Sequence, residues 1–167
     1  MKKILSMLLL SVMLCVVLTG CGMIVTRPEI KEGEFNISVT YEFNGEVKTL
    51  EGVYVCEYNG TSWALDGGSR RDWSGYIKDG KFEDVIDLGI TAEGYRVELN
   101  LALFPEHFMG ESVEGYEYVA TPYITVTVSN DEGIAVLHGK DSEGYCNARI
   151  IGYKYDEPIE NSFSLFN

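Results

Sequence analysis

The alternation of apolar and polar residues from Phe35 to Phe43 is the feature that most constrains the fold. Every second position in this segment is aliphatic or aromatic, and the positions between them are polar. A period of two over nine residues is typical of a β-strand that buries one face. Asn44-Gly45 follows directly and favours a two-residue type I′ turn, because both positions tolerate positive φ. The segment therefore predicts the first arm of a β-hairpin.

A two-residue turn also fixes the register of the hairpin. We expect four inner-face pairs, which are Tyr41 with Lys48, Val39 with Leu50, Ile37 with Gly52, and Phe35 with Tyr54. The same face continues to Cys56. An oxidising exterior would permit a disulfide between Cys56 and Cys146, and the alternative is two buried free thiols. A second Asn-Gly pair, Asn59-Gly60, predicts another turn before a short strand at Trp63 and Leu65.

Further short alternations, separated by turn-forming residues, predict more strands along the rest of the chain. They lie at 85–90, 95–103, 124–128, 134–138 and 146–150, with an edge strand expected at 162–166. No apolar period of 3.6 persists for three turns after residue 21. We predict an all-β fold, a single antiparallel β-sandwich or small barrel over residues 35–167. The order Cys, Trp, Cys resembles an immunoglobulin domain in architecture at most, because Tyr145 directly precedes Cys146.

The N-terminal segment has the order of a secretory signal. Two lysines are followed by an apolar run over residues 4–18, which is shorter than the roughly 20 residues of a membrane-spanning helix. The run closes with Leu18-Thr19-Gly20-Cys21, which resembles the bacterial lipobox. That resemblance implies a signal peptide over 1–20, cleavage before Cys21 and a diacylglyceryl group on its thiol. Two acyl chains give stable anchoring. We expect a lipid-anchored protein on the cell membrane or outer membrane, facing outside the cytoplasm, with residues 21–34 as a tether.

The charge balance restricts the partners of the body. The chain holds 13 Lys and Arg against 26 Asp and Glu, a net charge of −13, and loss of the signal's two lysines makes it −15. Such a surface repels nucleic-acid phosphates and anionic lipid headgroups. We therefore expect no nucleic-acid partner and a body that stands off the bilayer. A cationic partner, a divalent cation or an uncharged ligand remains open, as does an acidic surface that serves solubility alone.

The sequence contains few of the motifs that carry catalysis or metal binding. The two histidines, His107 and His138, do not occur in a zinc-binding motif, and no nucleophile or phosphate-loop motif is present. His138 shares the phase of Ile134 and Val136, so we expect it to be buried and structural. The acidic turns Asp131-Glu132 and Asp141-x-Glu143 lack the calcium-loop spacing. We predict no cofactor and no metal.

The segment from Trp63 to Tyr76 is the predicted binding surface. Trp63, Trp73 and Tyr76 flank a glycine-rich loop that bears Arg70 and Arg71. Aromatic rings stack on sugars or apolar side chains, and arginines pair with carboxylates. The alternative is that the tryptophans fill the core while the arginines offset nearby acids.

These features favour a non-catalytic binding module at the cell envelope, with a glycan, peptide or cationic protein as its partner. One alternative is an inhibitor of a cationic hydrolase, because Tyr54-Val55-Cys56 is similar to the Tyr-x-Cys strand of small lipoprotein lysozyme inhibitors. The other is an envelope enzyme that uses two carboxylates about 5–10 Å apart.

Overall fold

The protein is built from antiparallel β-sheets. The computed structural model describes residues 25–63, 69–111, 120–130, 133–142 and 144–164, so that the predicted signal peptide and Cys21 lie outside it. The elements, in chain order, are β1 (Arg27–Pro28), β2 (Glu32–Phe43), β3 (Glu46–Trp63), β4 (Ser69–Ile77), η1 (Lys78–Gly80), β5 (Val85–Ile90), β6 (Arg96–Asn100), α2 (Pro105–Phe108), β7 (Tyr123–Asn130), β8 (Gly133–His138), η2 (Gly139–Ser142), β9 (Ala148–Tyr155) and β10 (Phe163–Ser164). The predicted all-β class is confirmed.

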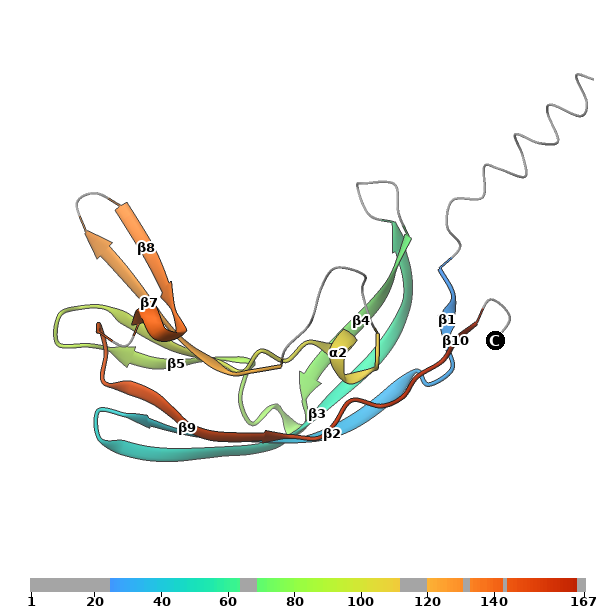
Figure 1. Cartoon of the computed structure of the whole chain (residues 1–167), viewed down its shortest axis with the longest axis horizontal. Coiled ribbons are helices and arrows are strands. Elements are labelled where there is room, and N and C mark those ends of the chain that lie inside the picture. The colour runs from blue at the N-terminus through green and yellow to red at the C-terminus, as the bar shows by residue number, and fades with distance from the viewer. Residues whose placement is uncertain (1–24, 64–68, 112–119, 131–132, 143, 165–167) are drawn as a thin grey trace, which may run out of the picture.

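The strands form two four-stranded sheets and one short pair. The long sheet has the order β4-β3-β2-β9, the short sheet has the order β5-β6-β7-β8, and β1 pairs with β10. Figure 1 shows the long sheet running the length of the molecule, with the short sheet over one end and α2 nearer the other. The β1–β10 pair lies at the end away from the short sheet.

The β2–β3 hairpin has the predicted register. All four expected pairs occur, from Tyr41 with Lys48 to Phe35 with Tyr54. Asn44 and Gly45 form the turn with φ of 52° and 82°, as the type I′ geometry requires. Asn59-Gly60 is different, because β3 continues through it to Trp63 and the register with β4 shifts between Tyr58 and Gly60. The predicted second turn is therefore a β-bulge.

The inner faces of both sheets share one hydrophobic core. Phe108 of α2 is fully buried and lies between Phe35 and Tyr54, with ring centroids 4.9 and 5.4 Å away. Two tyrosines fix the segment between β6 and α2, since Tyr54 donates to the Leu103 carbonyl (3.2 Å) and Tyr155 to that of Leu101 (2.7 Å). Burial raises the pKa of both phenols, so both remain donors. The core residues of the two sheets and α2 are Phe35, Ile37, Val39, Tyr41, Tyr54, Cys56, Trp73, Ile77, Val97, Leu99, Leu101, Leu103, Phe108, Met109, Ile124, Val126 and Ala148.

The predicted tether is shorter than residues 21–34. Residues 27–28 pair with 163–164 as β1 and β10, and the Glu29 amide donates to the Ser162 carbonyl at 2.8 Å. β2 itself begins at Glu32. The sequence between residues 25 and 34 did not predict the β1–β10 pairing, because a two-residue strand is too short to show alternation. The chain is already part of the folded body at Thr26.

The expected Cys56–Cys146 bridge is absent, and both thiols are free. Cys56 pairs with Gly33 at one end of β2, whereas Asn147 accepts a hydrogen bond from the Asn44 amide at the other end. A strand rises about 3.3 Å per residue, so the two cysteines lie on the order of 30 Å apart, and a disulfide needs Cα atoms within about 7 Å. Burial, with a smaller contribution from Glu106, raises the pKa of the Cys56 thiol to about 12.

His138 is exposed, contrary to the buried position expected for it. It lies on β8, an edge strand, on the same face as Ile134 and Val136, which are 74% and 49% exposed. Leu137, which pairs with the buried Val126, is the more buried residue instead, and Ala135 on the same phase is exposed. Alternation identified the strand correctly but did not indicate which of its two faces is buried. The His138 Nδ1 lies 3.4 Å from the Thr125 hydroxyl.

We predict that Gly75→Ala destabilises the protein by about 3 kcal/mol, because a Cβ at this position would lie 1.8 Å from the Tyr54 hydroxyl. Tyr54 is 3% exposed and cannot move aside without leaving the core. The matched control is Gly152→Ala on β9, where a Cβ would meet nothing within 4 Å. Chemical denaturation measures both variants, and equal midpoints would contradict the packing argument.

Candidate functional site

The predicted binding surface does not exist as one face. Along β4, Arg71, Trp73 and Ile77 point inward, and Arg70 and Tyr76 are exposed on the opposite side. The backbone of Trp63 ends β3, and its side chain lies outside the described part of the structure, as does the glycine-rich loop. The four predicted residues whose side chains are described are therefore divided between the core and the outer face.

Arg71 and Trp73 form a structural clamp. The Arg71 guanidinium donates to the Thr26 carbonyl (2.8 Å), the Thr26 hydroxyl (2.7 Å) and Glu111 (2.8 Å). It also lies 4.0 Å from the centre of the Phe163 ring. Trp73 is 7% exposed and donates its indole N–H to the other oxygen of Glu111. Trp73 therefore fills the core and Arg71 pairs with an acid, as the alternative interpretation of this segment expected.

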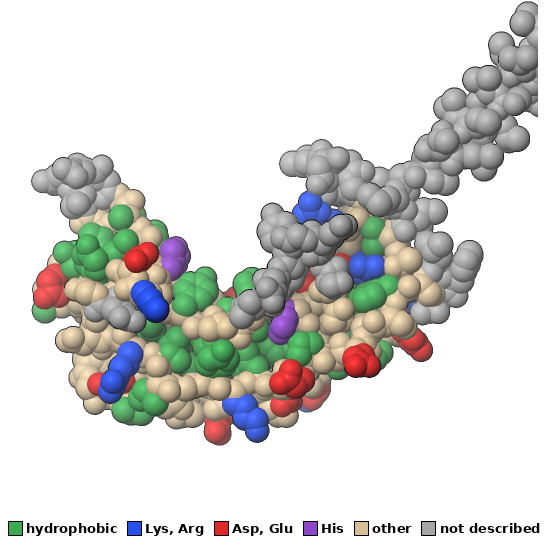
Figure 2. All heavy atoms as spheres, viewed as in Figure 1, with side chains coloured by type: hydrophobic (Ala, Val, Ile, Leu, Met, Phe, Trp, Pro, Cys, Tyr) green, Lys and Arg blue, Asp and Glu red, His purple; other side chains and the backbone are tan. Residues whose placement is uncertain are grey.

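The outer side of β4 carries the accessible ring of Tyr76, and an ion pair between η1 and β2 lies in the segment that follows β4. Tyr76 is 48% exposed, and its hydroxyl donates to Glu57 at 3.0 Å, an interaction that raises the pKa of Tyr76. Lys78 binds Glu34 at 2.7 Å, which raises the pKa of Lys78. Figure 2 shows acidic and basic side chains interspersed along the outer rim of the body.

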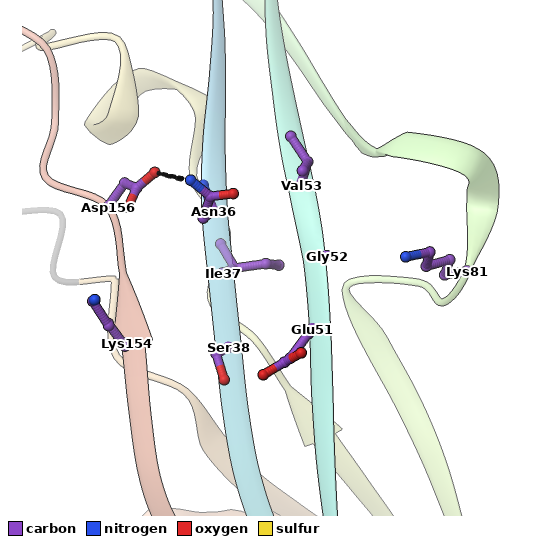
Figure 3. Close-up of a pocket in the computed structure, with 9 residues that line it drawn as sticks. All are labelled: Asn36, Ile37, Ser38, Glu51, Gly52, Val53, Lys81, Lys154 and Asp156. Atoms are coloured by element: carbon purple, nitrogen blue, oxygen red, sulfur yellow. Dashed lines mark hydrogen bonds between the residues drawn. The ribbon is translucent and has the colours of Figure 1, made fainter.

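A hollow of about 450 Å³ lies on the outer face of the long sheet (Figure 3). The register explains its lining, because Lys154 of β9, Ser38 of β2 and Glu51 of β3 occupy one cross-strand row. Lys81, from the loop after η1, approaches from the opposite side to Lys154. The residues that line the hollow are Asn36, Ile37, Ser38, Glu51, Gly52, Val53, Lys81, Lys154 and Asp156.

Asp156 has a structural role in this hollow. It accepts hydrogen bonds from the Asn36 amide (2.7 Å) and the Asn36 side chain (2.8 Å), and its own amide donates to the Asn36 carbonyl at 3.0 Å. These bonds close the end of β9 onto β2. Within the described residues, the side chains of Lys81, Lys154 and Glu51 have no hydrogen-bond or ion-pair partner. The hollow is therefore lined by two lysines and one glutamate whose charged groups have no partner among the described residues, and by the Asp156 carboxylate, whose hydrogen-bond donors are neutral.

A second hollow, of about 600 Å³, lies beside the β2–β3 turn and is less suited to a charged ligand. Its lining includes Cys146, whose pKa is raised by burial. Its two charged side chains are Arg149 and Glu42, and these bind each other at 2.6 Å. Their charges are already neutralised.

No sequence motif singled out Lys81 or Lys154 as a binding residue. They lie 73 positions apart in the chain, and only the pairing of β9 with β2 brings them to one hollow. The predicted strand at 146–150 ended before Lys154, whereas β9 continues to Tyr155. Tyr54, Val55 and Cys56, which carry the likeness to lysozyme inhibitors, are 3%, 3% and 0% exposed, so this strand presents none of them for contact with a hydrolase.

Comparison with known proteins yields no match to a family model, to a curated protein or to a solved structure. Among the described residues, no helix is both long and apolar enough to cross a bilayer. In the same part of the chain, no three His, Cys, Asp or Glu side chains are grouped so that they could hold a metal ion.

We expect Glu111→Ala to lower the free energy of unfolding by about 3 kcal/mol, because it leaves the Arg71 charge and the Trp73 N–H without their acceptor in a mostly buried site. Glu42→Ala is the matched control, since the Arg149 side chain that it leaves is 72% exposed, and its cost should stay below about 1 kcal/mol. Urea denaturation distinguishes the two variants. A Glu111→Ala effect no larger than that of Glu42→Ala would show that the clamp does not stabilise the fold.

Proposed function

We propose that this chain is a lipid-anchored, non-catalytic binding module on the outer side of a bacterial membrane, and that its ligand binds in the hollow between Lys81 and Lys154. The observation that carries the binding proposal is the pair of free ammonium groups over one hollow. Acids outnumber basic residues two to one in this chain, and five other basic side chains do pair with carboxylates.

The groups in the hollow favour a ligand that carries a carboxylate. Two ammonium groups attract an oxyanion, while Ser38 and Glu51 offer a hydroxyl and an acceptor for the polar groups beside it. The hollow is open to water, so each charge contact contributes at most about 1 kcal/mol. An acidic glycan or a peptide with a free C-terminal carboxylate, held by several weak contacts, satisfies this chemistry.

The location of the module rests on Leu18-Thr19-Gly20-Cys21 and its resemblance to the lipobox. The order of charge, apolar run and small residues before the cysteine supports cleavage and lipidation there. The strongly acidic composition of the body supports a soluble domain that depends on its lipid to remain at the membrane.

We expect Cys21→Ser to move the protein from the membrane fraction to the soluble or secreted fraction, because the acyl chains are lost. Cys15→Ser is the matched control, since that cysteine lies within the apolar run and follows the bulky Leu14. Cell fractionation, together with the mass of the N-terminal peptide, measures the outcome. Membrane retention of Cys21→Ser at the level of Cys15→Ser would refute lipid anchoring.

The ligand assignment predicts binding to arrays of uronic-acid oligosaccharides and peptides with free C-termini. Changing both Lys81 and Lys154 to Ala should weaken the positive probes about tenfold, which corresponds to about 1.4 kcal/mol. The control is the double change of Lys48 and Lys140 to Ala, which removes the same charge elsewhere. Unchanged affinity in the Lys81 and Lys154 variant, or binding only to probes that lack a carboxylate, would exclude this hollow as the site.

A further inference from the structure

The chain between the proposed anchor and the folded body is very short. Arg71 holds both the carbonyl and the hydroxyl of Thr26, and β1 begins at the next residue. Four residue steps separate Cys21 from Val25, the first residue that the structure describes. Even fully extended, four steps span only about 14 Å. Wherever Cys21 is held, the β1–β10 end of the body must remain close to it.

We propose that this end of the body docks on the anionic surface of the membrane through Arg27, Ile30 and Lys31. The inference rests on the proposed lipid anchor, and it adds an orientation and a lipid-contacting surface to it. We call these three residues the basal patch. All three are exposed, Ile30 to 41%, and they lie beside the point where the chain leaves the body.

The basal patch has free positive charge. Arg27 and Lys31 have no carboxylate partner among the described residues, and Glu29 between them is hydrogen-bonded by the Ser162 hydroxyl. Both cations line a hollow of about 320 Å³ with Tyr58, Asn59, Gly60 and Thr61. The amide and hydroxyl of Asn59 and Thr61 can donate hydrogen bonds to phosphate oxygens. The patch therefore offers the groups that bind a lipid phosphate.

The position of the basal patch at one end of the body makes this docking directional. A net charge of −15 is repelled by an anionic leaflet, but screening limits that field to about 8 Å at physiological salt. Near the surface, each basic residue contributes about 1 kcal/mol of attraction. In Figure 1, β1 and β10 lie at one end of the molecule, and the short sheet lies at the other. Docking by the basal patch thus holds the short sheet, at the other end of the body, away from the lipid.

The test uses the lipidated mature chain in vesicles of phosphatidylcholine, alone or with about 30% phosphatidylglycerol. A donor dye is placed on Glu160→Cys, near β10, or on Ile134→Cys of β8, and the acceptor dye is on lipid headgroups. Both carry Cys146→Ser, and Cys56 is fully buried and so protected from the dye. Flotation of the vesicles is measured in parallel.

Docking predicts stronger energy transfer from position 160 than from position 134, and a further rise at position 160 when phosphatidylglycerol is present. Changing Arg27 and Lys31 to Glu should abolish the rise, whereas changing Lys48 and Lys140 to Glu should preserve it. Flotation without a lipid-dependent rise, or a rise that survives the Arg27 and Lys31 changes, would overturn docking while leaving the anchor intact. Failure to float would refute the anchor itself, and docking with it.

Discussion

The register of the β2–β3 hairpin is the constraint on which the rest of the structure depends. Because Asn44 and Gly45 both adopt positive φ, the two strands pair without slippage over their whole common length. That pairing assigns one face of each strand to the core and the other to solvent. A shift of one residue would expose Phe35, Ile37 and Val39 and would bury Asn36 and Ser38. The β2–β3 pairing thus places the core residues on one face of the sheet and the lining of the Lys81–Lys154 hollow on the other.

Local sequence predicted the hairpin well because all the determinants of its register lie within a few residues of the turn. The same dipeptide at Asn59-Gly60 predicted a turn and formed a bulge, because β4 pairs with β3 on both sides of it. The alternation of β8 was recognised, but the wrong face of the strand was predicted to be buried. Ile134 and Val136 are apolar and yet exposed, so residue type alone did not identify the covered face. Whether an apolar strand face is covered depends on the neighbouring sheet, and that information is not local.

The candidate sites show the same limit. Trp73 and Arg71 have the composition of a binding surface, yet Glu111, 40 positions after Arg71, turns them into a clamp. Lys81 and Lys154 have no notable sequence context, and the pairing of β9 with β2 gives them their place. Cys56 was correctly predicted to lie on the inner face, but the direction of the strands puts Cys56 and Cys146 at opposite ends of the long sheet. Residue types indicate what a side chain can bind, and long-range pairing decides what it meets.

The clamp also relates the proposed lipid anchor at Cys21 to the proposed binding site between Lys81 and Lys154. Arg71 donates hydrogen bonds to both Thr26 and Glu111, and Trp73 donates to the other oxygen of Glu111. These bonds connect the segment at Thr26 to the core of the long sheet. A flexible tether would let the body rotate freely over an anchored lipid, whereas four residues followed by this clamp restrict its tilt. β1 and the outer face of β9-β2-β3 belong to one packed body, because β10 fixes β1 and the chain from β9 leads directly to β10. An anchor at Cys21 would therefore set the direction in which the Lys81–Lys154 hollow faces the surroundings.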